Sequence, residues 1–94
     1  MEFTLERFGN ELYIALKAIS DNQIEYEGVL YSFLTNEEIA KYISASLTVA
    51  NIAVQDLQQF GCIEMKEIAQ KKAFSITKFG SEVVKLMSRE NHIG

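Results

Sequence analysis

The side chains best suited to chemistry in this chain are amides, hydroxyls and lysines. Thr48, Asn51 and Gln55 recur at steps of three and four, which places them on one face of a helix. Asparagine and glutamine can bond an adenine edge at two points in the major groove of DNA, and an apolar group such as Ile52 can contact a thymine methyl. If this face met a duplex, an A·T-leaning site would follow as a hypothesis. The alternative is that these amides are only the solvated face of an amphipathic helix.

Two lysines, Lys71 and Lys72, lie where a β-hairpin is expected to turn, and they would neutralise phosphates if a duplex ran past. An ordinary polar turn is the other interpretation. The net charge of −4 opposes binding to a polyanion, but the charge is unevenly distributed. Residues 1–43 hold eight acidic and three basic side chains, whereas residues 44–94 hold five and six. The acidic excess therefore lies mainly outside the region expected to contact DNA.

Other kinds of site are not expected. The single cysteine, Cys62, excludes an internal disulfide framework, and one cysteine with one histidine cannot supply a zinc site. Cys62 is expected to be a small buried strand residue; a redox-sensing thiol or a bridge between subunits is the alternative. No nucleophile triad, phosphate loop or catalytic carboxylate pair is present at a useful spacing, so we expect no enzyme activity, no metal and no cofactor.

The composition predicts one globular domain over residues 1–94. The chain has 94 residues, 48% of them hydrophobic, and no segment approaches the length of a membrane span. A soluble cytoplasmic protein is expected. A domain this small buries only about 60 to 65% of its unfolded surface, so dimerisation would help its stability.

Hydrophobic periodicity and capping residues divide the chain into elements. Residues 1–22 are expected to hold an amphipathic helix, capped by Thr4 and weakened at Gly9, that forms a dimer contact. The segment from Ile24 to Leu34 is expected to be a loop leading into a short strand. Residues 35–60 are expected to form two helices joined by a tight turn, residues 62–77 a hairpin, and residues 78–89 a last helix.

The two central helices have strong local signals. Thr35 and Glu38 form a capping box at the start of the first, and Ser46 is a good cap for the second. Gly61 suits the residue after the second helix ends. The inward face of that helix is expected to comprise Leu47, Ala50, Ala53, Val54, Leu57 and Phe60.

The predicted hairpin alternates polar and apolar residues. Ile63 and Met65 are expected on one face of its first strand, with Gln70, Lys71 and Lys72 in the turn. Phe74 and Ile76 return on the same face, and Thr77 is expected to cap the last helix.

This order of elements resembles the winged helix-turn-helix transcription regulators of the MarR, PadR and ArsR kinds. The likeness is carried by the capped helix at Thr35, the ending Leu57, Gly61, Ile63, and the passage Phe74, Ile76, Thr77, Gly80. It implies an α+β, mainly α fold: a winged helix-turn-helix with a two- or three-stranded wing sheet and flanking N- and C-terminal helices. It also implies a homodimeric repressor or other regulator that binds double-stranded DNA.

The resemblance assigns roles by position. Base contacts would fall to Ser46, Thr48, Asn51, Ile52 and Gln55, and phosphate contacts to Lys41, Lys71, Lys72 and Lys78. If the alignment of this helix with the family is shifted by one residue, Val49 and Ile52 would face the groove in place of Thr48 and Asn51. The interval Leu47 to Phe60 contains no lysine or arginine, although many relatives place one there.

Two further interpretations remain open. The winged-helix frame could serve as a protein-interaction module without DNA binding, which would suit the acidic balance and an outward Ile52. Alternatively, a small-molecule effector could bind a cavity lined by aromatic side chains of the N-terminal third: Phe3, Phe8, Tyr13, Tyr26 and Tyr31.

Overall fold

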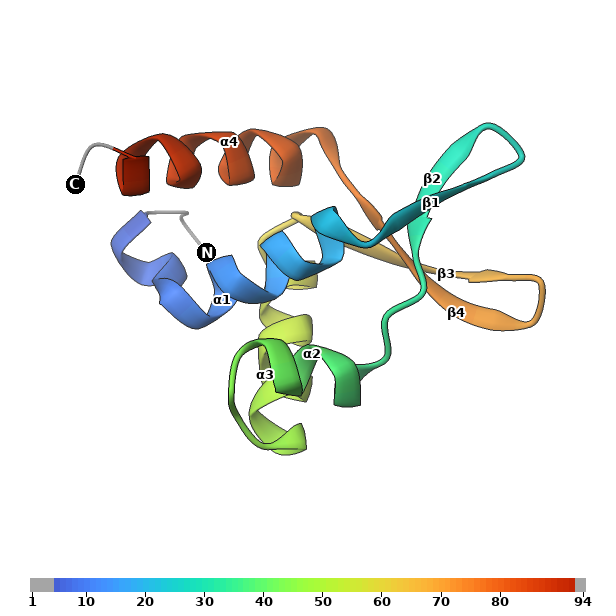
Figure 1. The fold of residues 1–94 in the computed structure, drawn as a ribbon, viewed down its shortest axis with the longest axis horizontal. Helices are drawn as coiled ribbons and strands as arrows, with labels where there is room; N and C mark the ends of the chain where they lie inside the picture. Colours follow the sequence, from blue (N-terminus) through green and yellow to red (C-terminus); the bar gives the residue numbers. More distant parts are fainter. Residues whose placement is uncertain (1–4, 93–94) are drawn as a thin grey trace.

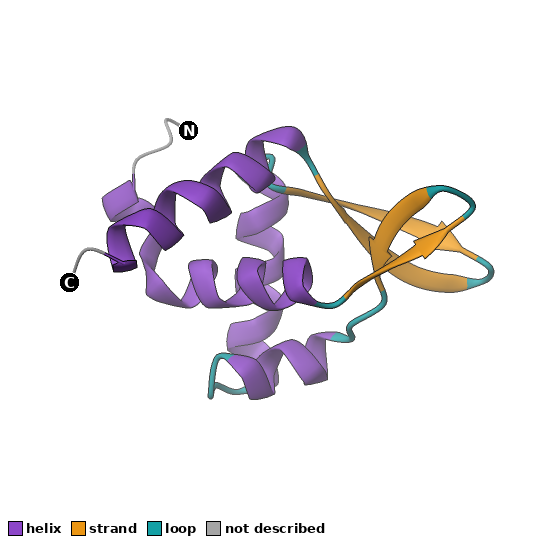
Figure 2. Ribbon diagram, turned by 45° about the horizontal axis from the view of Figure 1, so that its top comes forward, coloured by secondary structure: helices purple, strands orange, loops and turns teal. Residues whose placement is uncertain are grey.

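The computed structural model describes residues 5–92, with side chains described over residues 9–88. Thr4 and the side chains of Phe3 and Phe8 lie outside this part. Along the chain, the elements are α1 (Leu5–Asp21), β1 (Gln23–Tyr26), β2 (Val29–Ser32), α2 (Asn36–Tyr42), α3 (Leu47–Gln59), β3 (Ile63–Ile68), β4 (Lys71–Ile76) and α4 (Lys78–His92) (Figure 1). The helices gather at one side and the sheet projects from them (Figure 2).

The N-terminal helix is interrupted at Gly9. This residue has φ 78° and ψ 158°, which is not a helical conformation, so α1 contains a kink. A Cβ placed at Gly9 would meet no other atom within 4 Å, so close packing does not explain the glycine. Its positive φ does, because that region strongly favours glycine.

The segment after α1 is a β-hairpin, whereas a loop and one short strand were expected from the sequence. Strands β1 and β2 are antiparallel and are joined by Glu27 and Gly28, whose φ angles are 52° and 82°. Two consecutive positive φ values are typical of the two-residue type I′ turn, which matches the twist of the strands it connects. This hairpin makes a four-stranded sheet, in the order β1-β2-β4-β3, in place of the expected two or three strands.

The two hairpins of the sheet are joined at one point. Strands β2 and β4 share a single residue pair, Ser32 with Phe74, whereas β3 and β4 pair along six residues each. The hairpins diverge beyond that pair (Figure 1).

The helix-turn-helix follows the predicted caps. The Thr35 N–H donates to Glu38 Oε1 at 2.9 Å, and the Glu38 N–H donates to Thr35 Oγ1 at 3.1 Å, which completes the capping box. The turn passes through Ser44, whose φ is 54°. At the start of α3 the Val49 N–H donates to Ser46 Oγ at 3.3 Å, so the predicted cap is confirmed.

The core lies between the helices and one face of the sheet. Ala50, Ala53, Val54 and Leu57 of α3 are buried as predicted, together with Leu16, Ile19, Ile39 and Phe74 from the elements around them. Two inward predictions are wrong, because Leu47 is 44% exposed and Met65 is 49% exposed. Leu47 is the first residue of α3, and Met65 lies on β3, which pairs with β4 alone at the edge of the sheet.

The end of α3 and the start of α4 meet at one junction. The Cys62 N–H donates to the Leu57 carbonyl at 2.9 Å and the Gly61 N–H to the Gln58 carbonyl at 3.0 Å, the Schellman arrangement. The Thr77 hydroxyl bonds the Gly61 and Cys62 carbonyls and accepts from the Gly80 N–H at 3.0 Å, so Thr77 caps α4 as predicted.

Glycine is required at position 80 for space. A Cβ there would lie 2.1 Å from the Cys62 carbonyl oxygen and 2.9 Å from its carbon, both backbone atoms. Gly61 differs, because its φ is 78° and a Cβ would meet nothing within 4 Å.

We therefore expect Gly80→Ala to lower the free energy of unfolding by at least about 2 kcal/mol, despite the better helix propensity of alanine, because backbone must move. Gly61→Ala is the matched control and should cost only about 1 to 2 kcal/mol, from the left-handed conformation alone. Urea unfolding followed by circular dichroism measures both. Equal losses would contradict the proposed close approach of α4 to Cys62.

Candidate functional site

The outward face of α3 carries the residues selected from the sequence for base contacts. Thr48, Asn51, Ile52 and Gln55 are all exposed, and Ile52 is 52% exposed. Ser46 is exposed too, but its hydroxyl oxygen already accepts the Val49 N–H as the helix cap. The face therefore offers one hydroxyl, two amides and one apolar side chain, with no charge among them.

The alternative alignment, shifted by one residue, would require Val49 to face outward, but the structure places Val49 inward. Val49 is partly buried and packs against the core cluster, so its side chain is not part of the outward face. Thr48 and Asn51 have no such cover. The exposure pattern therefore favours the alignment with Thr48, Asn51 and Gln55 outward, with Ile52 beside them in either case.

The hairpin lysines lie in a strand and not in the turn. The turn between β3 and β4 is made by Ala69 and Gln70, with φ values of 52° and 66°, and Lys71 begins β4. This corrects the expectation that Gln70, Lys71 and Lys72 form the turn. Lys71 and Lys72 are both exposed.

Lys72 is joined to the helix-turn-helix through Asn36, the first residue of α2. The Lys72 ammonium donates to Asn36 Oδ1 at 3.3 Å, and Asn36 Nδ2 donates to Asn51 Oδ1 at 2.7 Å. The same ammonium lies 5.2 Å from the centre of the Phe74 ring, within the range of a cation–π contact. The structure thus brings a hairpin cation and an amide of α3 to the same place.

A groove of about 300 Å³ follows this connection between α2, α3 and β4. It is lined by Phe33, Leu34, Thr35, Asn36, Glu37, Leu47, Asn51 and Lys72. Asn36 was not among the sequence-predicted site residues. Its partners are 15 and 36 positions away along the chain, so no local spacing could have indicated it.

The other two lysines lie apart from this groove. Lys41 is exposed on α2, next to Glu38 and Tyr42. Lys78 begins α4, near the C-terminal end of α3, whereas Ser46 caps the opposite end of that helix (Figure 1). Of the four lysines selected from the sequence, Lys72 is the one the structure connects to the outward face of α3.

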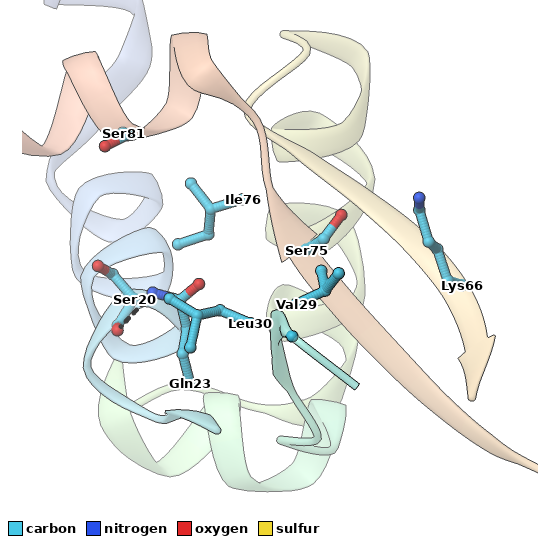
Figure 3. A pocket seen from close by; sticks show the side chains of 9 residues that line it. Ser20, Gln23, Val29, Leu30, Lys66, Ser75, Ile76 and Ser81 are labelled. Carbon is cyan, nitrogen blue, oxygen red and sulfur yellow. Dashed lines mark hydrogen bonds between the residues drawn. The ribbon is translucent and has the colours of Figure 1, made fainter. Parts of the chain in front are cut away.

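A second, larger pocket lies where the two hairpins diverge. It has a volume of about 570 Å³ and is lined by Ser20, Gln23, Gly28, Val29, Leu30, Lys66, Ser75, Ile76 and Ser81 (Figure 3). None of these residues is aromatic. Tyr13, proposed for an aromatic ligand cavity, instead bonds Ser88 of α4 at 3.0 Å, and Tyr31 lies against Phe33.

Cys62 is fully buried, as expected, but it lies directly before β3 and not within the strand. Burial raises the pKa of its thiol from 9.0 to about 11, so the nucleophilic thiolate is disfavoured at neutral pH. Within residues 5–92 no helix has the length and apolar character to cross a bilayer. No group of three His, Cys, Asp or Glu side chains in the described part could hold a metal ion.

Comparisons with known proteins identify the fold. No family model matches the chain, and no curated protein matches it. Among solved structures, it is similar to the transcriptional regulator SlyA, with 25% identity and a TM-score of 0.72 over 90% of this chain. This chain spans only 56% of SlyA.

Two similar structures are DNA complexes. A Staphylococcus aureus MepR–DNA complex matches with 22% identity and a TM-score of 0.70, over 90% of this chain and 67% of MepR. TubR from Bacillus thuringiensis serovar israelensis pBtoxis, bound to 24 bp of tubC, matches with 23% identity and a TM-score of 0.66, over 95% of this chain and 99% of TubR. The predicted winged helix-turn-helix fold is confirmed.

The buried thiol of Cys62 gives a test. We expect it to react with a disulfide reagent near pH 8 no faster than the protein unfolds, because the folded state keeps it protonated and covered. Since the folded pKa lies above the unfolded one, this thiol should leave the free energy of unfolding independent of pH below about pH 9 and should lower it as pH rises toward 11. Cys62→Ala should remove this part of the pH dependence in urea unfolding. Rapid labelling of the native protein would contradict the assignment.

Proposed function

We propose that this chain binds double-stranded DNA as a homodimer and regulates transcription. The observation that carries the proposal is the connection of Lys72, through Asn36, to the exposed amide face of α3. A positive charge for phosphate and hydrogen-bonding groups for base edges then lie on one surface. That MepR and TubR were solved with DNA supports the same role for this fold.

In this proposal α3 enters the major groove, which is wide enough for one helix. Thr48, Asn51 and Gln55 then face base edges, and Ile52 meets a thymine methyl. Lys71 and Lys72 meet phosphates from the side of the hairpin. Lys41 and Lys78 extend the phosphate contacts at the two flanks of α3. Because α3 contains no lysine or arginine, affinity depends on lysines outside that helix.

The dimer is proposed to form through α1 and α4. These helices lie side by side (Figures 1 and 2), and Tyr13 is bonded to Ser88 between them. Leu86 of α4 is 44% exposed, an apolar group that a second copy would cover. Two copies of α3 would then meet successive major grooves about 34 Å apart.

A protein-interaction module is the second candidate. The outward Ile52 and the absence of lysine and arginine from α3 favour it, because a docking surface for a protein needs apolar area and no phosphate contacts. Dependence on salt separates the two functions. Binding to DNA weakens steeply as salt rises, whereas apolar docking does not.

The lysines provide the first test of DNA binding. In gel shifts over a salt series, replacing Lys71 and Lys72 with alanine should weaken binding and reduce the log–log salt slope by about 0.9 for each phosphate that is no longer neutralised. Lys17→Ala is the matched control, since Lys17 is an exposed lysine of α1 paired with Asp21 at 2.7 Å. It should leave the slope unchanged. No retardation of any duplex by the unaltered protein at low salt would remove the DNA role.

The dimer has its own test. We expect Leu86→Glu to halve the sedimentation mass, because a charge would then be buried between two copies. Ile24→Glu is the control, since Ile24 is 56% exposed on β1 and belongs to neither of the proposed dimer helices. That variant should keep the dimer mass. A monomeric unaltered protein would contradict the proposed interface, and circular dichroism checks that each variant is folded.

A further inference from the structure

Lys72, Asn36 and Asn51 form a chain of two hydrogen bonds, which we call the relay, and in both bonds the donor lies on the side of Lys72. The relay runs from the Lys72 ammonium to Asn36 Oδ1 (3.3 Å) and from Asn36 Nδ2 to Asn51 Oδ1 (2.7 Å). A lysine ammonium has donors only, so the Asn36 group that faces it must be the oxygen. The Asn36 nitrogen then faces Asn51, and Asn51 must present its oxygen in return. The charge of Lys72 thereby determines how both amides are oriented.

The relay also determines which hydrogen-bonding groups of the Asn51 amide remain available to a partner. Its oxygen already accepts a hydrogen bond from Asn36, while both hydrogens of its nitrogen remain available. Asn51 is exposed on α3, so these hydrogens can meet a ligand from outside. The cation–π contact with Phe74, at 5.2 Å, helps to hold the lysine at the start of the relay.

We propose that Lys72 and Asn36 are positioning residues that make Asn51 a hydrogen-bond donor toward the major groove, so that it selects guanine. This inference rests on the proposed DNA binding. In the major groove, guanine presents two acceptors, N7 and O6, whereas adenine presents one acceptor and one donor. A side chain that offers donors therefore fits guanine better. At this position the inference replaces the A·T preference that the residue types alone favoured.

The orientation can be reversed by one substitution. In Asn36→Asp the residue has acceptors only, so it still pairs with Lys72 but now accepts from the Asn51 nitrogen. Asn51 then turns its oxygen outward. Asn36 is the first residue of α2, where an acidic side chain is favourable, so this variant should fold.

The experiment is binding-site selection from random duplexes, followed by competition with single-base variants. Asn51→Ala identifies the contacted base pair, as the one whose preference it abolishes. The unaltered protein should prefer guanine there by about tenfold. Asn36→Asp should shift the preference to a base that presents a donor, adenine or cytosine. Lys72→Arg keeps the donors and should keep the preference, whereas Lys72→Gln should reduce it.

A charge-matched control separates orientation from repulsion. Gln70→Glu adds the same negative charge at the exposed hairpin turn and should weaken binding without changing the preferred base. A guanine preference unchanged in Asn36→Asp, or an adenine preference of the unaltered protein at the Asn51 position, would overturn the relay and leave DNA binding standing. If the unaltered protein binds no duplex at low salt, both the proposed function and this inference fail.

Discussion

The contact between Thr77 and the end of α3 is the constraint on which the rest of the structure depends. The Thr77 hydroxyl donates to the carbonyls of Gly61 and Cys62, and the backbone N–H of Thr77 donates to the Cys62 carbonyl at 3.0 Å. The first strand of the hairpin starts directly after Cys62, and the second ends directly before Thr77. Both ends of the hairpin are therefore fixed to the same turn of backbone. This attachment fixes both ends of the β3–β4 hairpin beside the end of α3, and β4 carries Lys72 to Asn36.

Local signals in the sequence predicted most of the fold, because caps and periodic faces depend on residues a few positions apart. The capping box at Thr35, the cap at Ser46 and the turn of backbone at Gly61 are all confirmed. The β1–β2 hairpin was missed because its strands have four residues each, and its Glu27-Gly28 turn is not one of the commonest signals. Leu47 and Met65 were predicted inward from periodicity alone. Periodicity shows which residues share a face, but it does not show whether a neighbouring element covers that face at each position.

The candidate site could be predicted in its residue types and not in its connections. Periodicity selected Thr48, Asn51 and Gln55 for the outward face, and the structure exposes all three. It gave no reason to select Asn36, which the sequence presents only as the residue after a helix cap. The link to Asn51 and Lys72 exists because the hairpin folds back beside α2, a relation between distant segments. The orientation of an amide is likewise set by its partners, so it needed coordinates.

The single pair between Ser32 and Phe74 has a consequence for how the sheet behaves as a whole. A continuous sheet transmits twist from strand to strand along a shared ladder. Here one residue pair joins the two hairpins, so the β1–β2 ladder and the β3–β4 ladder share almost no hydrogen bonds. An insertion in the turn of the β1–β2 hairpin would therefore leave the pairing of β3 with β4 undisturbed.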